Sequence, residues 1–88
     1  DLNAGKKCSW HYHEIKDEVF YLQSGKMVVR YGDDDDINEA NQMFLEPGMN
    51  FYVYPGLLHQ MEAIEDSELF EFSTQHFEND SYRVIKGD

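Results

Sequence analysis

Three histidines and one glutamate are spaced so that they could share one metal ion. His11 and His13 are separated by a single residue in a strand-like segment, and side chains two positions apart on a strand face the same side, about 7 Å apart. Glu18 begins the next expected strand, and His59 follows the Pro55-Gly56 turn. Three imidazoles and one carboxylate suit Mn, Fe, Co, Ni, Cu or Zn and do not suit Ca or Mg. On an octahedral ion they leave positions open for water or substrate, which is typical of a catalytic rather than a structural metal site.

Three other groups of residues could do chemistry, but each lacks part of the pattern that the chemistry needs. His13-Glu14 looks like the start of the HExxH motif of zinc proteases, but Asp17 stands in place of the second histidine. The acidic run Asp33–Asp36 lacks the alternating ligands and the glycine of an EF-hand loop, so we expect a solvated hairpin tip. On a regular strand Cys8 would point away from the two nearby histidines, so we do not expect it to act as a nucleophile.

The segments that must position these residues are short runs of alternating or apolar residues, which predict an all-β fold. Gly25 follows the second run directly and predicts a hairpin between the second and third strands. The polar stretch Gly32–Gln42 is expected to be a loop, with a helical turn near Asn38–Ala40. Turn signals recur about every eight to twelve residues, as in a sandwich or barrel. Strands are expected at Cys8–Tyr12, Val19–Gln23, Lys26–Tyr31, Met43–Leu45, Phe51–Tyr54, Leu58–Ile64, Glu68–Thr74 and Tyr82–Ile85.

Strand alternation also predicts which residues surround the ligands. We expect Lys7, Phe20 and Met61 to line a mostly apolar substrate pocket, although Phe20 and Met61 fit a hydrophobic core equally well. Lys7 could bind a carboxylate or a phosphate, or it could be an exposed lysine at a strand end. The fourth histidine, His76, lies in a polar stretch and is expected at the surface or in a lid. The residues in phase with a ligand on its own strand are Lys7 and Ser9 for His11, Phe20 and Leu22 for Glu18, and Met61 and Ala63 for His59.

The opposite phase of the same strands is unusually aromatic for a face in contact with solvent. It contains Trp10, Tyr12, Val19 and Tyr21. An apolar outer face needs a cover, so we expect either a second sheet layer or a partner subunit against it.

Composition excludes several classes of protein. The chain has 88 residues, of which 18 are acidic and 7 are basic, and its net charge is -11. Such a surface repels phosphate backbones, so nucleic acid is not expected as a partner. No apolar run approaches the ~18–20 residues that span a bilayer, so we expect no membrane contact. The single cysteine cannot form an internal disulfide and fits a reducing compartment, so we expect a cytoplasmic protein.

The spacing of the candidate ligands resembles the two sequence motifs of the cupin superfamily. In the second motif Gly48, Gly56 and His59 match, while Tyr54 stands where the family has a proline and Ala63 where it has an asparagine. The resemblance extends from the first motif to the second, over about two thirds of the chain. The first motif is matched at every defined position, by Gly5, His11, His13, Glu18 and Gly25.

The resemblance implies a cupin-type double-stranded β-helix, which is a jelly-roll barrel with a metal inside near one mouth. It implies one cupin domain over residues 1–88, and because the chain starts at Asp1 we expect N-terminal residues to be missing. It also implies homodimers built by contact between sheets. The implied ligands of one divalent transition metal (Mn, Fe, Ni, Co or Zn) are His11, His13, Glu18 and His59.

The end of the chain, with Glu71-Phe72-Ser73-Thr74 followed by Tyr82-Arg83-Val84, resembles small cupins similar to the phosphomannose isomerase barrel. This likeness implies a metal-dependent isomerase or epimerase that acts on a sugar or sugar phosphate, with Glu71 as the catalytic base if it points inward. Two alternatives stay open. One is an Fe-dependent dioxygenase, and the other is a non-enzymatic, metal-containing barrel that binds a small molecule or carbohydrate.

Overall fold

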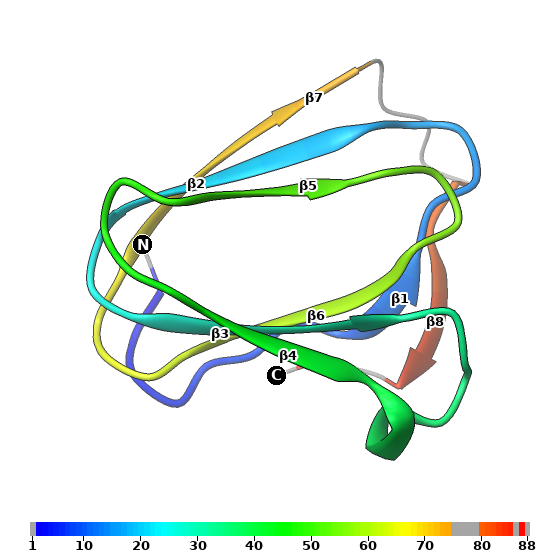
Figure 1. Ribbon diagram of the computed structural model, residues 1–88, viewed down its shortest axis with the longest axis horizontal. Helices are drawn as coiled ribbons and strands as arrows, with labels where there is room; N and C mark the ends of the chain where they lie inside the picture. The colour runs from blue at the N-terminus through cyan, green and yellow to red at the C-terminus, as the bar shows by residue number, and fades with distance from the viewer. Residues whose placement is uncertain (1, 75–79, 86, 88) are drawn as a thin grey trace.

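The computed structural model describes residues 2–74, 80–85 and 87, and most of them lie in two antiparallel sheets that face each other (Figure 1). The larger sheet has the strand order β4-β3-β6-β1-β8, and the smaller sheet has the order β5-β2-β7. A single turn of 3-10 helix, η1, is the only helix in the described part of the chain. The elements are β1 (Trp10–Tyr12), β2 (Glu18–Ser24), β3 (Met27–Gly32), η1 (Ile37–Glu39), β4 (Asn41–Leu45), β5 (Asn50–Val53), β6 (Leu58–Ala63), β7 (Glu68–Ser73) and β8 (Tyr82–Ile85).

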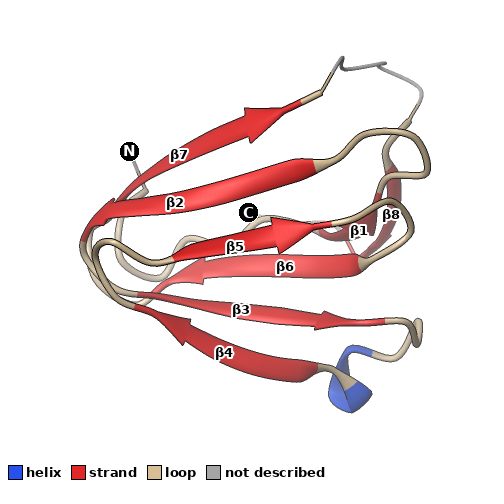
Figure 2. Cartoon of the chain, turned by 45° about the horizontal axis from the view of Figure 1, so that its top comes forward, coloured by secondary structure: helices blue, strands red, loops and turns tan. Residues whose placement is uncertain are grey.

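The chain crosses between the sheets at nearly every described turn (Figure 2). The connections β1–β2, β2–β3, β4–β5, β5–β6 and β6–β7 each join one sheet to the other, and only the β3–β4 connection stays within a sheet. This winding confirms the predicted cupin-type jelly roll. Among the described residues, no helix has the length and apolar character needed to cross a membrane.

The hairpin predicted between β2 and β3 is wrong, because these strands belong to different sheets. Gly25 lies at the corner between them with a φ of 91°, a conformation that favours glycine. A Cβ atom at this position would clash with the Ser67 hydroxyl and the Asp66 carbonyl. The next residue, Lys26, donates its N–H to the Ser67 hydroxyl at 3.1 Å, so the turn is held against the β6–β7 connection rather than folded back on β2.

A bulge in the first strand changes which residues face inward. Lys7 pairs with Glu62 and His11 pairs with His59. The segment from Lys7 to His11 is therefore one residue longer than the segment from His59 to Glu62 that it faces. The extra residue breaks strand alternation. Cys8 therefore lies on the same side as the histidines, where its sulfur accepts the N–H of Met61 at 3.1 Å, and the prediction that Cys8 points away from them is wrong.

The core lies between the two sheets, and one large aromatic residue is buried outside it. Trp10 is fully buried on the outer side of the larger sheet, where its indole N–H donates to the carbonyl of Asp35 at 3.0 Å. The cover expected over Trp10 is thus a loop of the same chain rather than a second sheet or a partner. Tyr12 stacks on Tyr82, with ring centroids 4.9 Å apart. The core itself consists of Phe20, Leu22, Met27, Val29, Leu45, Val53, Leu57, Met61 and Ala63.

Candidate metal centre

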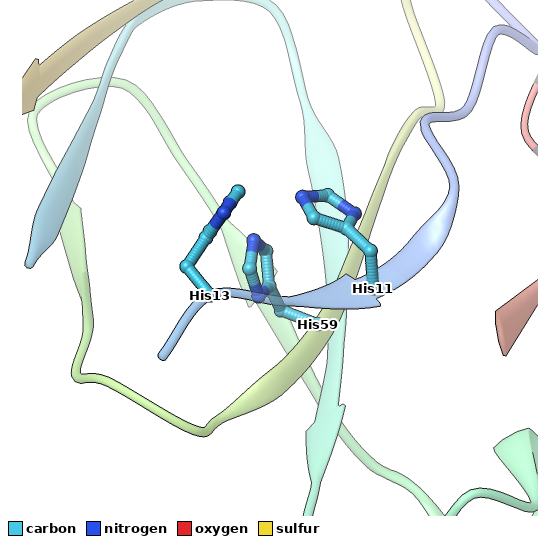
Figure 3. Close-up of side chains that lie close together, drawn as sticks. All are labelled: His11, His13 and His59. Atoms are coloured by element: carbon cyan, nitrogen blue, oxygen red, sulfur yellow. The ribbon is translucent and has the colours of Figure 1, made fainter. Parts of the chain in front are cut away.

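Three histidines from two neighbouring strands converge inside the barrel (Figure 3). His11 lies on β1 and pairs directly with His59 on β6, and His13 follows β1 by one residue. One nitrogen of each ring lies within 4.8 Å of the corresponding nitrogens of the other two. The structure therefore brings together all three of the predicted histidines, from segments about 46 to 48 residues apart in sequence.

Each of these imidazoles uses Nδ1 to donate to a backbone carbonyl. His11 donates to Ser9 at 2.9 Å, His13 to Asp80 at 2.8 Å and His59 to Leu57 at 2.9 Å. A carbonyl oxygen only accepts, so Nδ1 carries the proton and Nε2 keeps its lone pair. A hydrogen bond of this kind fixes the tautomer and the ring orientation of metal-binding histidines in general.

The fourth predicted ligand, Glu18, lies beside two of these rings. Its Oε1 atom is 3.1 Å from Nε2 of His13 and 3.7 Å from Nε2 of His59. Glu18 is only 2% exposed, and its Oε1 and Nε2 of His59 are both buried without a hydrogen-bond partner. Buried polar atoms without a partner are rare, since each loses its contact with water. A cation among them would satisfy both atoms, and the donor set of imidazole nitrogens and a carboxylate fits a transition metal.

Burial controls the protonation of these groups. It raises the pKa of Glu18 to about 8, and the neighbouring Glu71 carboxylate adds to the rise. It lowers the pKa of His59 to about 3, and the neighbouring His11 adds to the fall. Burial also lowers the pKa values of His11 and His13. At neutral pH the three imidazoles are therefore neutral and able to bind a metal, while without a cation Glu18 keeps a proton that a metal would displace.

The ligands line a cavity of about 230 Å³. Phe20 and Met61 line it while also belonging to the core, so both sequence interpretations apply to them. Glu71 lines it as well, because it pairs with Phe20 across β2 and β7 and shares its inward face. The described residues around the cavity are Cys8, His11, His13, Lys16, Glu18, Phe20, His59, Met61, Leu69 and Glu71.

Lys7, expected in this pocket, is placed elsewhere by the structure. The bulge turns Lys7 to the outer side of the larger sheet, where it lines a separate cavity of about 470 Å³ with Arg30 and Gln60. His76 lies outside the described residues.

Sequence reasoning missed two charged residues that are buried at the site. Lys16 is 6% exposed, and its Nζ lies 3.7 Å from Glu18 and 3.6 Å from Glu71. Asp80 is 1% exposed, and its carboxylate accepts the backbone N–H groups of residues 14, 15 and 16 at 2.9 to 3.2 Å. Both residues lie in polar stretches typical of solvated turns, and nothing in their local pattern indicates burial.

Comparisons with known proteins agree on the fold. A family model described as a cupin domain matches residues 1–72. Comparison with curated protein sequences gave no match. The capsular polysaccharide assembling protein CapF from Staphylococcus aureus superposes with a TM-score of 0.80 at 22% identity, over 94% of this chain and 26% of CapF.

Two smaller proteins superpose over much of the chain as well. KdgF from Halomonas sp. has a TM-score of 0.74 at 23% identity, over 89% of this chain and 66% of KdgF. The 3,4-ketoisomerase QdtA from Thermoanaerobacterium thermosaccharolyticum, in complex with TDP-4-keto-6-deoxyglucose, has a TM-score of 0.79 at 17% identity, over 94% of this chain and 60% of QdtA. The chain thus spans about a quarter of CapF and 60% of QdtA, and at these identities the likeness is one of fold.

Proposed function

The chain belongs to the cupin family, and we propose that it is a metal-dependent enzyme that isomerises or epimerises a sugar or a related hydroxy-carbonyl compound. The observation that carries this proposal is the convergence of three imidazoles whose Nδ1 atoms all donate to backbone carbonyls, beside a buried carboxylate oxygen without a partner. In the proposal His11, His13, Glu18 and His59 hold one divalent transition metal, which is Mn, Fe, Co, Ni or Zn.

Glu71 is the proposed base. A bound metal would polarise adjacent carbonyl and hydroxyl oxygens of a substrate and so make the C–H bond between them more acidic. In the metal-free protein the hydrogen bond with Glu18 lowers the pKa of Glu71, and the Lys16 ammonium adds to the fall. When a metal displaces the Glu18 proton, Lys16 still lies 3.6 Å from Glu71 and keeps it ionised at neutral pH. Glu71 can therefore take the proton from the hydroxyl-bearing carbon and return it to the neighbouring carbonyl carbon. The isomerisation is complete when the hydroxyl proton passes to the former carbonyl oxygen.

The lining of the cavity supports chemistry on a small organic molecule. Phe20, Met61 and Leu69 give the cavity an apolar surface beside the ligands. Such a surface packs against C–H groups and keeps water away from a carbanion-like species. Among proteins of the same fold, QdtA is a 3,4-ketoisomerase, which supports the reaction class at the level of the fold only.

The test begins with elemental analysis of protein purified without a metal-affinity tag. Aldoses, ketoses and their phosphates are then assayed for isomerisation with Mn, Fe, Co, Ni or Zn, in the native chain and in His59→Ala. We expect turnover that needs the metal and disappears in the variant. No turnover with any metal, together with a lower melting temperature on chelation, would favour the non-enzymatic barrel. Oxygen consumption confined to the iron form would favour the dioxygenase.

We also propose that the chain forms a homodimer through the outer face of the smaller sheet. Tyr52 and Phe72 flank Val19 on the neighbouring strands, and Phe70 lies beside Tyr21. All three aromatic residues are exposed, Tyr52 to 52%, Phe72 to 62% and Phe70 to 46%. A contiguous aromatic face of this kind is typical of a contact surface. Sedimentation equilibrium tests it, and a strict monomer at micromolar concentration would contradict it. A cytoplasmic location stays a prediction.

A further inference from the structure

Lys16 is the only lysine or arginine among the described residues that line the histidine cavity. Its ammonium lies between two carboxylates, 3.7 Å from Glu18 and 3.6 Å from Glu71. The Lys16 and Glu18 side chains are 7% and 2% exposed, so water screens this pair weakly, whereas Glu71 is 43% exposed. The positive charge of Lys16 is thus already opposed within the protein.

A phosphate group needs more than this cavity offers. Phosphate sites are built from arginine forks, lysines or helix N-termini, whose donors are directed at the oxygens. No arginine and no helix end is among the described residues that line the cavity. A phosphate dianion here would instead face the carboxylate of Glu71, which lines the cavity beside Lys16.

The total charge of the site leads to the same conclusion. The imidazoles are neutral, since each has its proton on Nδ1 and a lone pair on Nε2. In the metal-loaded site Glu18 and Glu71 are both ionised, and Lys16 and the divalent cation oppose them. The loaded site therefore has one net positive charge. One positive charge can balance a ligand with one negative charge, which is either an enolate formed from a neutral ligand or a single carboxylate. It cannot balance the two negative charges of a phosphate dianion.

The size of the cavity sets an upper limit on what it encloses. Its volume is about 230 Å³, and a liquid water occupies ≈ 30 Å³, so it holds the equivalent of about eight waters. This is enough for a single sugar ring, and Phe20, Met61 and Leu69 offer apolar surface for its C–H groups. We infer that the cavity takes an unphosphorylated compound of monosaccharide size, neutral or with one carboxylate, and discriminates against sugar phosphates. This inference rests on the proposed function and narrows its substrate class.

The experiment separates metal binding from ligand choice. The metal content of the native chain is measured first, and a chain that binds no metal would overturn the proposed function itself. The metal-loaded protein is then titrated by calorimetry with mannose, fructose and galacturonate, and with mannose 6-phosphate, fructose 6-phosphate and thymidine diphosphate. We expect at least one unphosphorylated compound to bind, about tenfold or more tightly than the phosphates. Normal metal loading with equal or tighter binding of a phosphate, or with no binding of any unphosphorylated compound, would overturn the inference alone.

A charge variant tests the physical reason. Glu71→Gln removes one of the two carboxylates that oppose Lys16 and keeps the shape of the side chain. We expect its affinity for the sugar phosphates to rise by about threefold or more, with metal content unchanged. The matched control is Glu46→Gln, which removes an exposed carboxylate that pairs with Lys26, outside the cavity lining, and should leave both classes of ligand unaffected. If Glu71→Gln leaves the discrimination unchanged, charge is not its cause and the inference is wrong.

Discussion

The backbone carbonyl of Asp80 accepts the Nδ1 proton of His13 at 2.8 Å, and the carboxylate of the same residue accepts the backbone N–H groups of the turn after His13. One residue from the far end of the chain therefore orients a proposed ligand and also holds the turn that leads to Glu18. Because the carboxylate is buried with all these donors around it, its loss would leave several buried N–H groups without an acceptor.

Asp80→Ala should therefore weaken both the fold and the metal site. We expect a loss of about 2–4 kcal/mol in the free energy of unfolding. Metal affinity should fall by no more than about 10-fold, because the carbonyl that accepts from His13 is kept and only the turn that positions it is loosened. Denaturant titration of the metal-free protein and a chelator competition measure the two effects. Asp36→Ala is the control, because it removes an exposed cap on Asn38 and should cost about 1 kcal/mol while metal affinity stays unchanged. Equal metal affinity in both variants would argue against the role of Asp80.

The buried carboxylate of Glu18 should make the metal-free protein less stable at alkaline pH. Its pKa rises from 4.5 in the unfolded chain to about 8 in the folded one, so between these values the folded state holds a proton that the unfolded state has lost. Stability from this group is present at low pH and falls as the pH rises, by at most about 1.4 kcal/mol per unit. His59 acts in the opposite direction below 6.5, because its pKa falls to about 3.

The window for this measurement therefore begins about one pH unit above 6.5, where the imidazoles of His11, His13 and His59 are largely neutral in the unfolded chain as well, and it extends to about 8. Denaturant midpoints of the metal-free chain should fall across it, and Glu18→Gln, which cannot ionise, should show a flatter profile. A decline of the same size in the variant would mean that another group is responsible.

Removal of the metal should lower the melting temperature. A ligand that binds only the folded state at about a thousand times its dissociation constant adds about 4 kcal/mol, and each kcal/mol shifts the melting temperature of a domain this small by about 4–8 °C. We expect chelation to lower it by about 10 °C or more in the native chain. In His59→Ala the shift should vanish, whereas Gln60→Ala, on the same strand but facing outward, should retain it.

Gly25 and Gly56 share a positive φ but differ in their surroundings, which makes them a matched pair. Both have a φ of 91°, yet a Cβ on Gly25 would clash with the β6–β7 connection while a Cβ on Gly56 would meet open space. Gly56→Ala should cost about 1 kcal/mol from backbone conformation alone. Gly25→Ala should cost clearly more, as read from denaturant midpoints. Equal losses would mean that the corner between the sheets adapts to the extra atom.

Sequence patterns predicted the strands and the ligands better than the connections. The strand ranges follow from alternation, and Tyr82–Ile85 matches the structure to the residue. The spacing of His11 and His13 is a local property of one strand, and His59 was predicted from its match to the second family motif. The pairing of His11 with His59 then brings the three together. A glycine at a turn cannot reveal whether the next strand pairs with the previous one or crosses to another sheet, which is why the hairpin at Gly25 was wrong.

What the sequence could not reveal depends on register and on distant parts of the chain. A bulge has no marker in the residues from Lys7 to His11, yet it turns Lys7 outward and Cys8 inward. Lys16 and Asp80 are buried only because segments more than sixty residues apart in the sequence meet around the turn. Such residues look like ordinary solvated charges until the tertiary structure is known.

The three imidazoles take their orientation from main-chain oxygens of Ser9, Asp80 and Leu57. A main-chain oxygen is present whatever side chain its residue carries, so mutational drift at these three positions does not by itself remove an acceptor. Side chains around the site can thus change, and with them the metal and the substrate, while the orientation of the three imidazoles is kept as long as the backbone keeps its path.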